Sequence, residues 1–233
     1  MKRFYKQVTV AEAADGFGVA LDGRRIKTVG GRQQTVPTRA LAEAMAAEWA
    51  AQGETIDPAG FILRDLADYA IDVVAAGRPA VIAETLPYAE TDTLCYRAEP
   101  DEALGIRQRA EWDPLLAWAE AQWGVALQPV AGVIHRPQPA EALANLRARL
   151  EALDAFMLAA LRNTASLAAS LIVGLAALEA EADLTALWAA ASLEETWQAD
   201  LWGHDAEAAE RAEKRFAAFC AAARFAALAR QQN

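Results

Sequence analysis

The sequence predicts an α+β fold, in which a small N-terminal α+β domain with a short antiparallel sheet precedes a larger, all-helical domain that resembles an orthogonal bundle. Strand-like alternation and turn dipeptides dominate the chain up to Pro37. After Pro79, apolar residues recur mostly at helical spacing. Gly77 and Pro79 interrupt the helical pattern between the two parts. We therefore expect domains at 1–78 and 79–233.

The N-terminal sheet is predicted from alternating runs and a hairpin turn. Residues 3–10, "RFYKQVTV", alternate as a strand does. "FGVALDGRRIKT" places Asp22-Gly23 between two short runs. This dipeptide favours a two-residue hairpin, because both central residues must take positive φ. "GGRQQTVPT" then predicts a second turn and a short strand that ends at Pro37.

Helices are predicted over most of the remaining chain. Thr38 is a good N-cap for a helix that ends near Gly53, and a second helix is expected over 61–74. The further helical segments are roughly 79–90, 102–122, 139–152, 154–163, 166–180, 183–201 and 205–230. Segments 93–97 and 124–136 carry strand-like residues instead and are candidates for extra strands of the N-terminal sheet.

The composition is that of a globular protein, with 55% hydrophobic and 23% charged residues. The net charge of −10 argues against nucleic acid or an anionic membrane surface as a partner, because both would repel the protein at long range. Two distant cysteines, Cys95 and Cys220, suit a reducing compartment. The N-terminus lacks the apolar run of a signal peptide, and "LAASLIVGLAAL" is shorter than the roughly 20 residues that span a bilayer. We expect a bacterial cytoplasmic protein without membrane insertion.

Few residues suggest catalysis, and neither a metal, a cofactor nor a nucleotide is expected. The glycines between residues 16 and 31 lack the GxGxxG and GxxxxGK[ST] spacings. His135 precedes two prolines and is interpreted as a loop or strand-end residue. The alternative in the enzyme class is a metal-assisted or carboxylate-based hydrolase built on His204, Asp205 and Glu207, although their spacing matches no established metal motif.

The stretch "ETWQADLWGHDAEAAER" (195–211) is interpreted as a corner between two helices. Gly203 follows the first helix as a residue that can take positive φ, and Asp205 is an N-cap for the second. Glu207 and Glu210 each stand four residues before a cation, which favours ion pairs along the helix. Trp197 and Trp202 are five residues apart, so they are offset by roughly 140° and cannot both face one buried stripe.

Five segments occur in an order that resembles a known family: "RFYKQVTV…GVALDGRRIKT", "VPTRALAEAMAAEWAAQGETIDP", "DTLCYRA", "WDPLLAWAEAQWG" and "WQADLWGHDAEAAERAEKR". This family comprises the F-type ATP synthase assembly chaperones that bind the alpha subunit of the catalytic head, the ATP-twelve family of mitochondria and alpha-proteobacteria. The resemblance runs from about Arg3 to Phe225, nearly the whole chain.

The resemblance implies a non-catalytic protein that uses no nucleotide. It would hold the newly made alpha subunit, whose unassembled interface is apolar, until the beta subunit replaces it. The family also places importance on an acidic residue after the Trp-Gly pair. The matching positions are Asp205, Glu207 and Glu210, of which Glu207 is favoured, and Trp202 and Trp197 complete the expected partner-binding residues. A structural adaptor with another partner is the remaining alternative.

Overall fold

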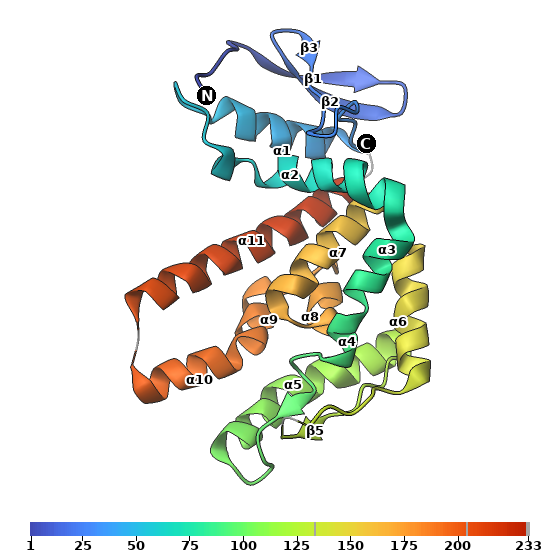
Figure 1. Cartoon of the computed structure of the whole chain (residues 1–233), viewed down its shortest axis with the longest axis vertical. Helices are drawn as coiled ribbons and strands as arrows, with labels where there is room; N and C mark the ends of the chain where they lie inside the picture. Colours follow the sequence, from blue (N-terminus) through green and yellow to red (C-terminus); the bar gives the residue numbers. More distant parts are fainter. Residues whose placement is uncertain (133, 204, 232–233) are drawn as a thin grey trace. The chain divides into compact units, whose positions relative to one another are not determined.

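A computed structural model describes residues 1–132, 134–203 and 205–231. The chain folds into two compact units. Unit 1 contains Met1–Arg78, Asp154–Ala160 and Ala221–Asn233, and unit 2 contains Pro79–Leu153 and Leu161–Cys220. A small antiparallel sheet near the N-terminus and a mostly helical remainder make up the predicted α+β fold (Figure 1).

The sheet of unit 1 has three antiparallel strands in the order β1 (Val8–Ala13), β2 (Gly16–Leu21) and β3 (Arg24–Arg25). Asp22 and Gly23 join β2 to β3 with φ values of 47° and 79°, which confirms the predicted hairpin turn. The first strand begins at Val8 rather than at Arg3, because the Asp22 carboxylate accepts hydrogen bonds from the backbone N–H groups of Lys6 and Gln7.

Helix α1 (Arg39–Ala50) packs on β1 and β2 (Figure 1). Thr38 Oγ1 accepts a hydrogen bond of 3.1 Å from Leu41 N, which confirms the predicted N-cap. A 3₁₀ turn, η1 (Pro58–Gly60), leads into α2 (Ile62–Tyr69). The predicted single helix over 61–74 instead ends in a π-helical turn, η2 (Ala70–Val74).

Residues from much later in the chain complete the core of unit 1. Phe225 is fully buried and stacks on Phe156, with the ring centroids 6.1 Å apart. Thr38 Oγ1 also donates a hydrogen bond of 2.8 Å to the Leu228 carbonyl. The capping side chain therefore ties the start of α1 to the segment 221–230.

The later helices are more numerous than the sequence indicated. Ala169 takes a φ of 48°, and Ser170 Oγ accepts from Val173 N at 3.0 Å, so the predicted helix 166–180 is broken at these residues. Ser192 likewise divides the predicted helix 183–201. The bounds are α3 (Ala75–Thr85), α4 (Pro87–Glu90), α5 (Ala103–Trp123), α6 (Ala140–Ala152), α7 (Ala155–Ala168), α8 (Leu171–Ala176), α9 (Leu184–Ala191), α10 (Leu193–Trp202) and α11 (Ala206–Arg230).

The expectation that segments 93–97 and 124–136 extend the N-terminal sheet is wrong. They form a separate parallel pair of strands, β4 (Tyr96–Arg97) and β5 (Val130–Ala131), within unit 2. The apolar residues of these segments are buried there: Leu94, Cys95, Val125, Leu127 and Val130. Their strand-like character reflects burial beside helices of unit 2, which a propensity alone does not distinguish from pairing in another sheet.

A buried carboxylate joins two segments in the core of unit 2. Asp92 is fully buried, and its two oxygens accept hydrogen bonds of 3.1 Å from Leu94 N and Ile172 N. Burial raises the pKa of Asp92 to about 6, although hydrogen bonds to Ser170 and to backbone N–H groups lower it in part. In the part of the chain that the structure describes, no helix is long and apolar enough to cross a membrane.

Candidate partner-binding site

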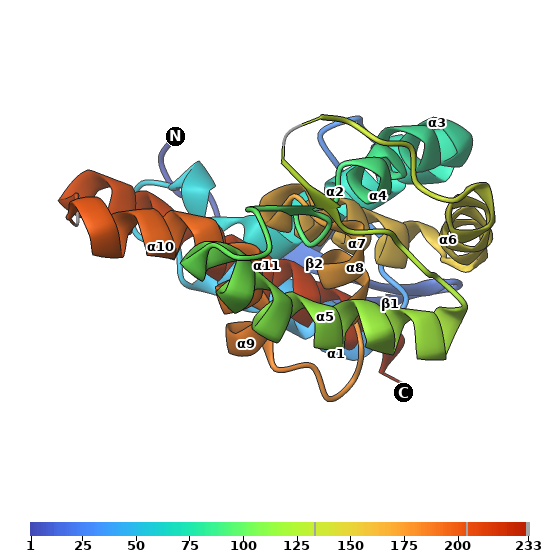
Figure 2. The same cartoon turned by 90° about the horizontal axis from the view of Figure 1, so that it is seen from below.

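The helix corner predicted over 195–211 lies in unit 2 and is formed by α10 and the first half of α11. Gly203 follows α10 with a φ of 100°, and its N–H donates to the Ala199 carbonyl at 2.9 Å. Asp205 Oδ1 accepts from Glu207 N at 2.8 Å, which confirms Asp205 as an N-cap of α11. The chain reverses at this junction, and both helices extend from it in the same general direction (Figures 1 and 2).

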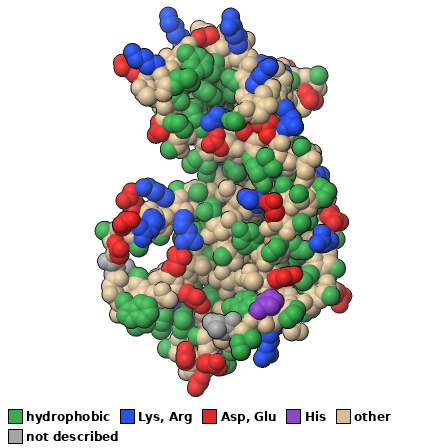
Figure 3. All heavy atoms as spheres, in the orientation of Figure 1, with side chains coloured by type: hydrophobic (Ala, Val, Ile, Leu, Met, Phe, Trp, Pro, Cys, Tyr) green, Lys and Arg blue, Asp and Glu red, His purple; other side chains and the backbone are tan. Residues whose placement is uncertain are grey.

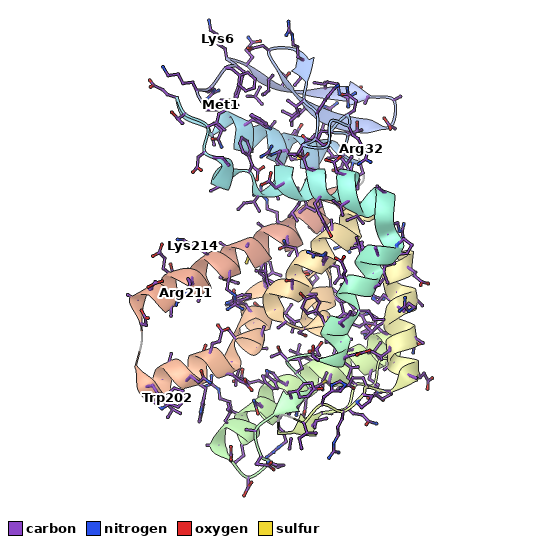
Figure 4. All side chains as sticks on the ribbon, viewed as in Figure 1. Met1, Lys6, Arg32, Trp202, Arg211 and Lys214 are labelled. Atoms are coloured by element: carbon purple, nitrogen blue, oxygen red, sulfur yellow. The ribbon has the colours of Figure 1, made fainter. Side chains whose placement is uncertain are left out.

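The two tryptophans of the corner face different surroundings, as their angular offset predicts. Trp202 projects from the end of α10 and is 79% exposed, and its neighbour Leu201 is 61% exposed (Figure 4). Trp197 is half-buried, and the guanidinium of Arg107 lies 6.0 Å from its ring centroid. An exposed indole beside an exposed leucine is an apolar patch of the kind that mediates protein contacts.

The acidic residues of α11 form ion pairs along its exposed face. Glu207 pairs with Arg211 at 2.5 Å, and Glu210 pairs with Lys214 at 2.6 Å. All four side chains are exposed, so each pair contributes only about 0.3–0.5 kcal/mol to stability. Figure 3 shows cationic and acidic side chains along the first half of α11 and hydrophobic side chains at the end of α10, and Figure 4 labels Arg211 and Lys214 on α11. The carboxylates thus stay accessible to a partner.

A groove of about 420 Å³ lies between α9, α10 and α11. Its apolar lining includes Trp188, Ala189, Ala199, Ala209, Ala212 and Phe216. Glu195 and Asp205 add acidic groups to this lining. Arg215 holds Glu195 through hydrogen bonds of 2.9 and 3.1 Å, and its guanidinium lies 5.3 Å from the Trp188 ring. The corner therefore combines an apolar groove, an exposed indole and a row of carboxylates.

Two residues of the alternative hydrolase site, Asp205 and Glu207, make contacts that stabilise α11. Asp205 caps a helix and Glu207 pairs with Arg211, while His204 lies outside the described residues. Among residues 1–132, 134–203 and 205–231, no group of three or more His, Cys, Asp or Glu side chains can hold a metal ion. His135 Nδ1 lies 2.9 Å from the hydroxyl of Tyr96 on the exposed surface, as expected for a loop histidine.

Comparison with known proteins identifies the family. The family model described as ATP12 chaperone protein matches residues 2–120, more than half of the chain. The chain belongs to the ATP12 chaperone family. It is thus a member of a family of chaperones for ATP synthase assembly.

Individual members of the ATP12 family are similar over nearly the whole chain. Protein atp12, mitochondrial, of Schizosaccharomyces pombe is 26% identical over 214 residues, which cover 87% of this chain and 74% of the relative. The crystal structure of Atp12 from Paracoccus denitrificans superposes with a TM-score of 0.92 at 40% identity and covers 98% of each chain. A mutant of that Paracoccus protein matches equally well.

The sequence did not indicate the groove beside the α10–α11 corner. Trp188 lies on α9 and packs against Phe216 and Phe219 of α11, with ring centroids 5.8 and 5.4 Å apart. These residues are about thirty positions apart, and neither helix alone shows that its aromatic face lines an open groove. The only signal in the sequence was the clustering of Trp188 with the two tryptophans of α10.

Proposed function

We propose that this protein holds the unassembled alpha subunit of the F-type ATP synthase and releases it when the beta subunit occupies the same surface. The likeness to Atp12 over 98% of the chain, at 40% identity, carries this proposal. An unassembled subunit exposes apolar interface, which promotes association with wrong partners. Covering that interface would be enough to prevent such association, and it requires neither catalysis nor a nucleotide.

The α10–α11 corner is the surface that we assign to this contact. Trp202 and Leu201 supply exposed apolar area, while Glu207, Glu210 and Asp205 supply negative charge beside it. Trp197 supports the corner from the half-buried face of α10. A buried aromatic anchor with a charged rim is the common arrangement of protein interfaces. Charge complementarity would then favour a cationic patch on the alpha subunit.

An aggregation assay tests the function. Purified protein should suppress light scattering by isolated alpha subunit at a near-stoichiometric ratio, because each molecule covers one interface. Added beta subunit should displace it. Equal aggregation of the alpha subunit with and without the protein would contradict the proposal.

Charge reversal at the corner tests the surface. Glu207→Lys should weaken capture of the alpha subunit about tenfold, because it places a cation where a cationic partner would bind. Glu120→Lys, at another exposed position in unit 2, makes the same charge change and should leave capture unaltered. Circular dichroism checks the fold of both variants. Loss of helix content in the Glu207 variant alone would show a structural role for that residue.

A further inference from the structure

Unit 1 contains a pocket of about 600 Å³ that shares no residue with the α10–α11 corner. The N-terminal segment, the β2–β3 hairpin, α1 and α2 all contribute to it. Its apolar lining comprises Phe4, Tyr5, Leu21, Ile26 and Trp49. Figure 3 shows hydrophobic side chains on the surface of unit 1, with Lys and Arg and also Asp and Glu side chains around them.

The aromatic residues of this pocket are fixed by mutual contacts. Tyr5 meets Trp49 edge to face, with ring centroids 5.5 Å apart, and its hydroxyl donates to the Trp49 carbonyl at 2.6 Å. The Arg64 guanidinium lies 4.4 Å from the Phe61 ring centroid and 5.9 Å from that of Trp49. Phe4 is 63% exposed, so apolar area remains open at the pocket.

The charged lining is strongly unbalanced. Arg24, Arg25, Lys27 and Arg64 line the pocket, and Asp22 is the acidic lining residue. Residues 1–78 contain ten cationic and ten acidic side chains, and the whole chain carries −10, so this cationic excess is local. A concentrated positive field of this kind attracts anionic groups even on an acidic protein.

The cations of the pocket are only partly engaged. Arg64 pairs with Asp65 at 2.8 Å, and Arg25 donates to Thr35 Oγ1 at 2.8 Å. Arg24 and Lys27 are exposed and form no ion pair among the described residues. These two side chains are therefore free to meet an anion.

Three buried donors of the lining add to the positive potential. Trp49 is 8% exposed, and its indole Nε1 donates no hydrogen bond within the described structure. The Nε atoms of Arg25 and Arg64 are buried without an acceptor in the same part of the chain. Buried donors are nearly always paired in folded proteins, and their dipoles favour negative charge nearby.

We propose that this pocket binds a carboxylate-bearing peptide segment in which acidic and apolar residues alternate. The cationic rim would bind the carboxylates, and the aromatic lining would cover the adjacent apolar side chains. The combination favours a polypeptide over a small anion, because a small anion would leave the apolar area uncovered. This inference rests on the proposed function, since the segment would belong to the client polypeptide.

Peptide binding tests the pocket directly. The probe is a fluorescently labelled hexapeptide of alternating glutamate and leucine, and binding to the whole protein is measured by anisotropy. A peptide with glutamine in place of glutamate should bind about tenfold more weakly, because it lacks the charge. Inorganic phosphate at the same concentration should not displace the acidic peptide.

Paired variants locate the binding. Arg24→Glu with Lys27→Glu should weaken binding of the acidic peptide about tenfold or more. Arg147→Glu with Arg224→Glu makes the same charge change at exposed positions outside the pocket and should leave binding within twofold, as a rough bound. Trp49→Phe removes the indole donor and should weaken binding by about threefold to tenfold.

Equal binding by both double variants would overturn the proposal, as would displacement of the peptide by inorganic phosphate at the same concentration. The exposed positions of Arg24 and Lys27 keep the test valid should Trp49→Phe fail to fold. The alpha-subunit aggregation assay is run in parallel. If the protein suppresses aggregation of the alpha subunit but does not bind the acidic peptide, the proposed peptide site in this pocket is wrong and the proposed function still stands.

Discussion

Asp92 shows how one residue makes the stability of unit 2 depend on pH. Its carboxylate is fully buried, and burial raises its pKa from 3.8 to about 6. A carboxyl with a raised pKa in the folded state favours folding in its protonated form. This contribution is fully present below pH 3.8 and is lost as the pH rises through about 6.

Replacing Asp92 with asparagine should abolish this pH dependence. A pKa raised from 3.8 to about 6 corresponds to a free-energy difference of about 3 kcal/mol. The free energy of unfolding of the wild type, relative to Asp92→Asn, should therefore fall by about 3 kcal/mol as the pH rises from well below 3.8 to well above about 6. The variant also leaves Leu94 N or Ile172 N without an acceptor, which costs about 1–3 kcal/mol at any pH. Urea unfolding at several pH values measures both effects.

Asp101→Asn is the control, because Asp101 is exposed. It should unfold with the same pH profile as the wild type. Parallel profiles for the wild type and Asp92→Asn would contradict the assigned role of Asp92.

Short elements with local signals were predictable from the sequence, and elements fixed by distant contacts were not. Asp22-Gly23, the Thr38 cap and the Gly203–Asp205 junction each depend on one or two neighbouring residues, and the structure has all three. The strands β4 and β5 depend on a pairing across more than thirty residues and are only two residues long. Their propensity indicated strands but not the partner.

The candidate site likewise has features that local sequence predicts and features that depend on distant residues. The order of helix end, glycine, cap and acidic face along 195–211 can be derived from the sequence. The groove depends on Trp188, Glu195 and Phe216, which three different helices bring together. The pocket of unit 1 likewise unites residues from four segments. Neither cavity has a periodic signature in the sequence.

The contact between α7 and α8 requires a glycine. A Cβ atom at Gly174 would lie 2.8 Å from the backbone N and Cα of Ala165. Gly174→Ala should therefore reduce the free energy of unfolding by about 1–3 kcal/mol, because the backbone of α7 must shift to accept the methyl group. Thermal or urea unfolding measures the change.

Gly53 supplies the matched control, since a Cβ atom there would meet no atom within 4 Å. Gly53→Ala should change stability by no more than about 0.5 kcal/mol. Similar effects of the two substitutions would show that the distance between α7 and α8 is not limited by Gly174.

At the scale of the whole molecule, the acidic charge should make client capture sensitive to salt. The protein carries −10, and the proposed contact places carboxylates against cationic groups. Raising the salt concentration from about 0.01 M to about 1 M shortens the Debye length from about 30 Å to about 3 Å. Capture of the alpha subunit should weaken by about threefold or more over this range.

Sedimentation of the alpha subunit with the protein at each salt concentration measures this effect. Glu207→Lys should show a shallower salt dependence than the wild type, because one attractive charge has become repulsive. Capture that stays constant or strengthens with salt would indicate a contact dominated by apolar burial.

The division of α11 between the two units has a consequence for synthesis on the ribosome. Unit 1 needs residues 221–230, including the fully buried Phe225, yet these are translated after all of unit 2. Domains generally fold in the order in which they emerge from the ribosome. Here unit 1 contains the first residues to be translated, yet it is the last unit to have all its residues. A nascent chain stalled near residue 220 would contain every residue of unit 2, while Phe156 of unit 1 still lacked Phe225, the ring that stacks on it.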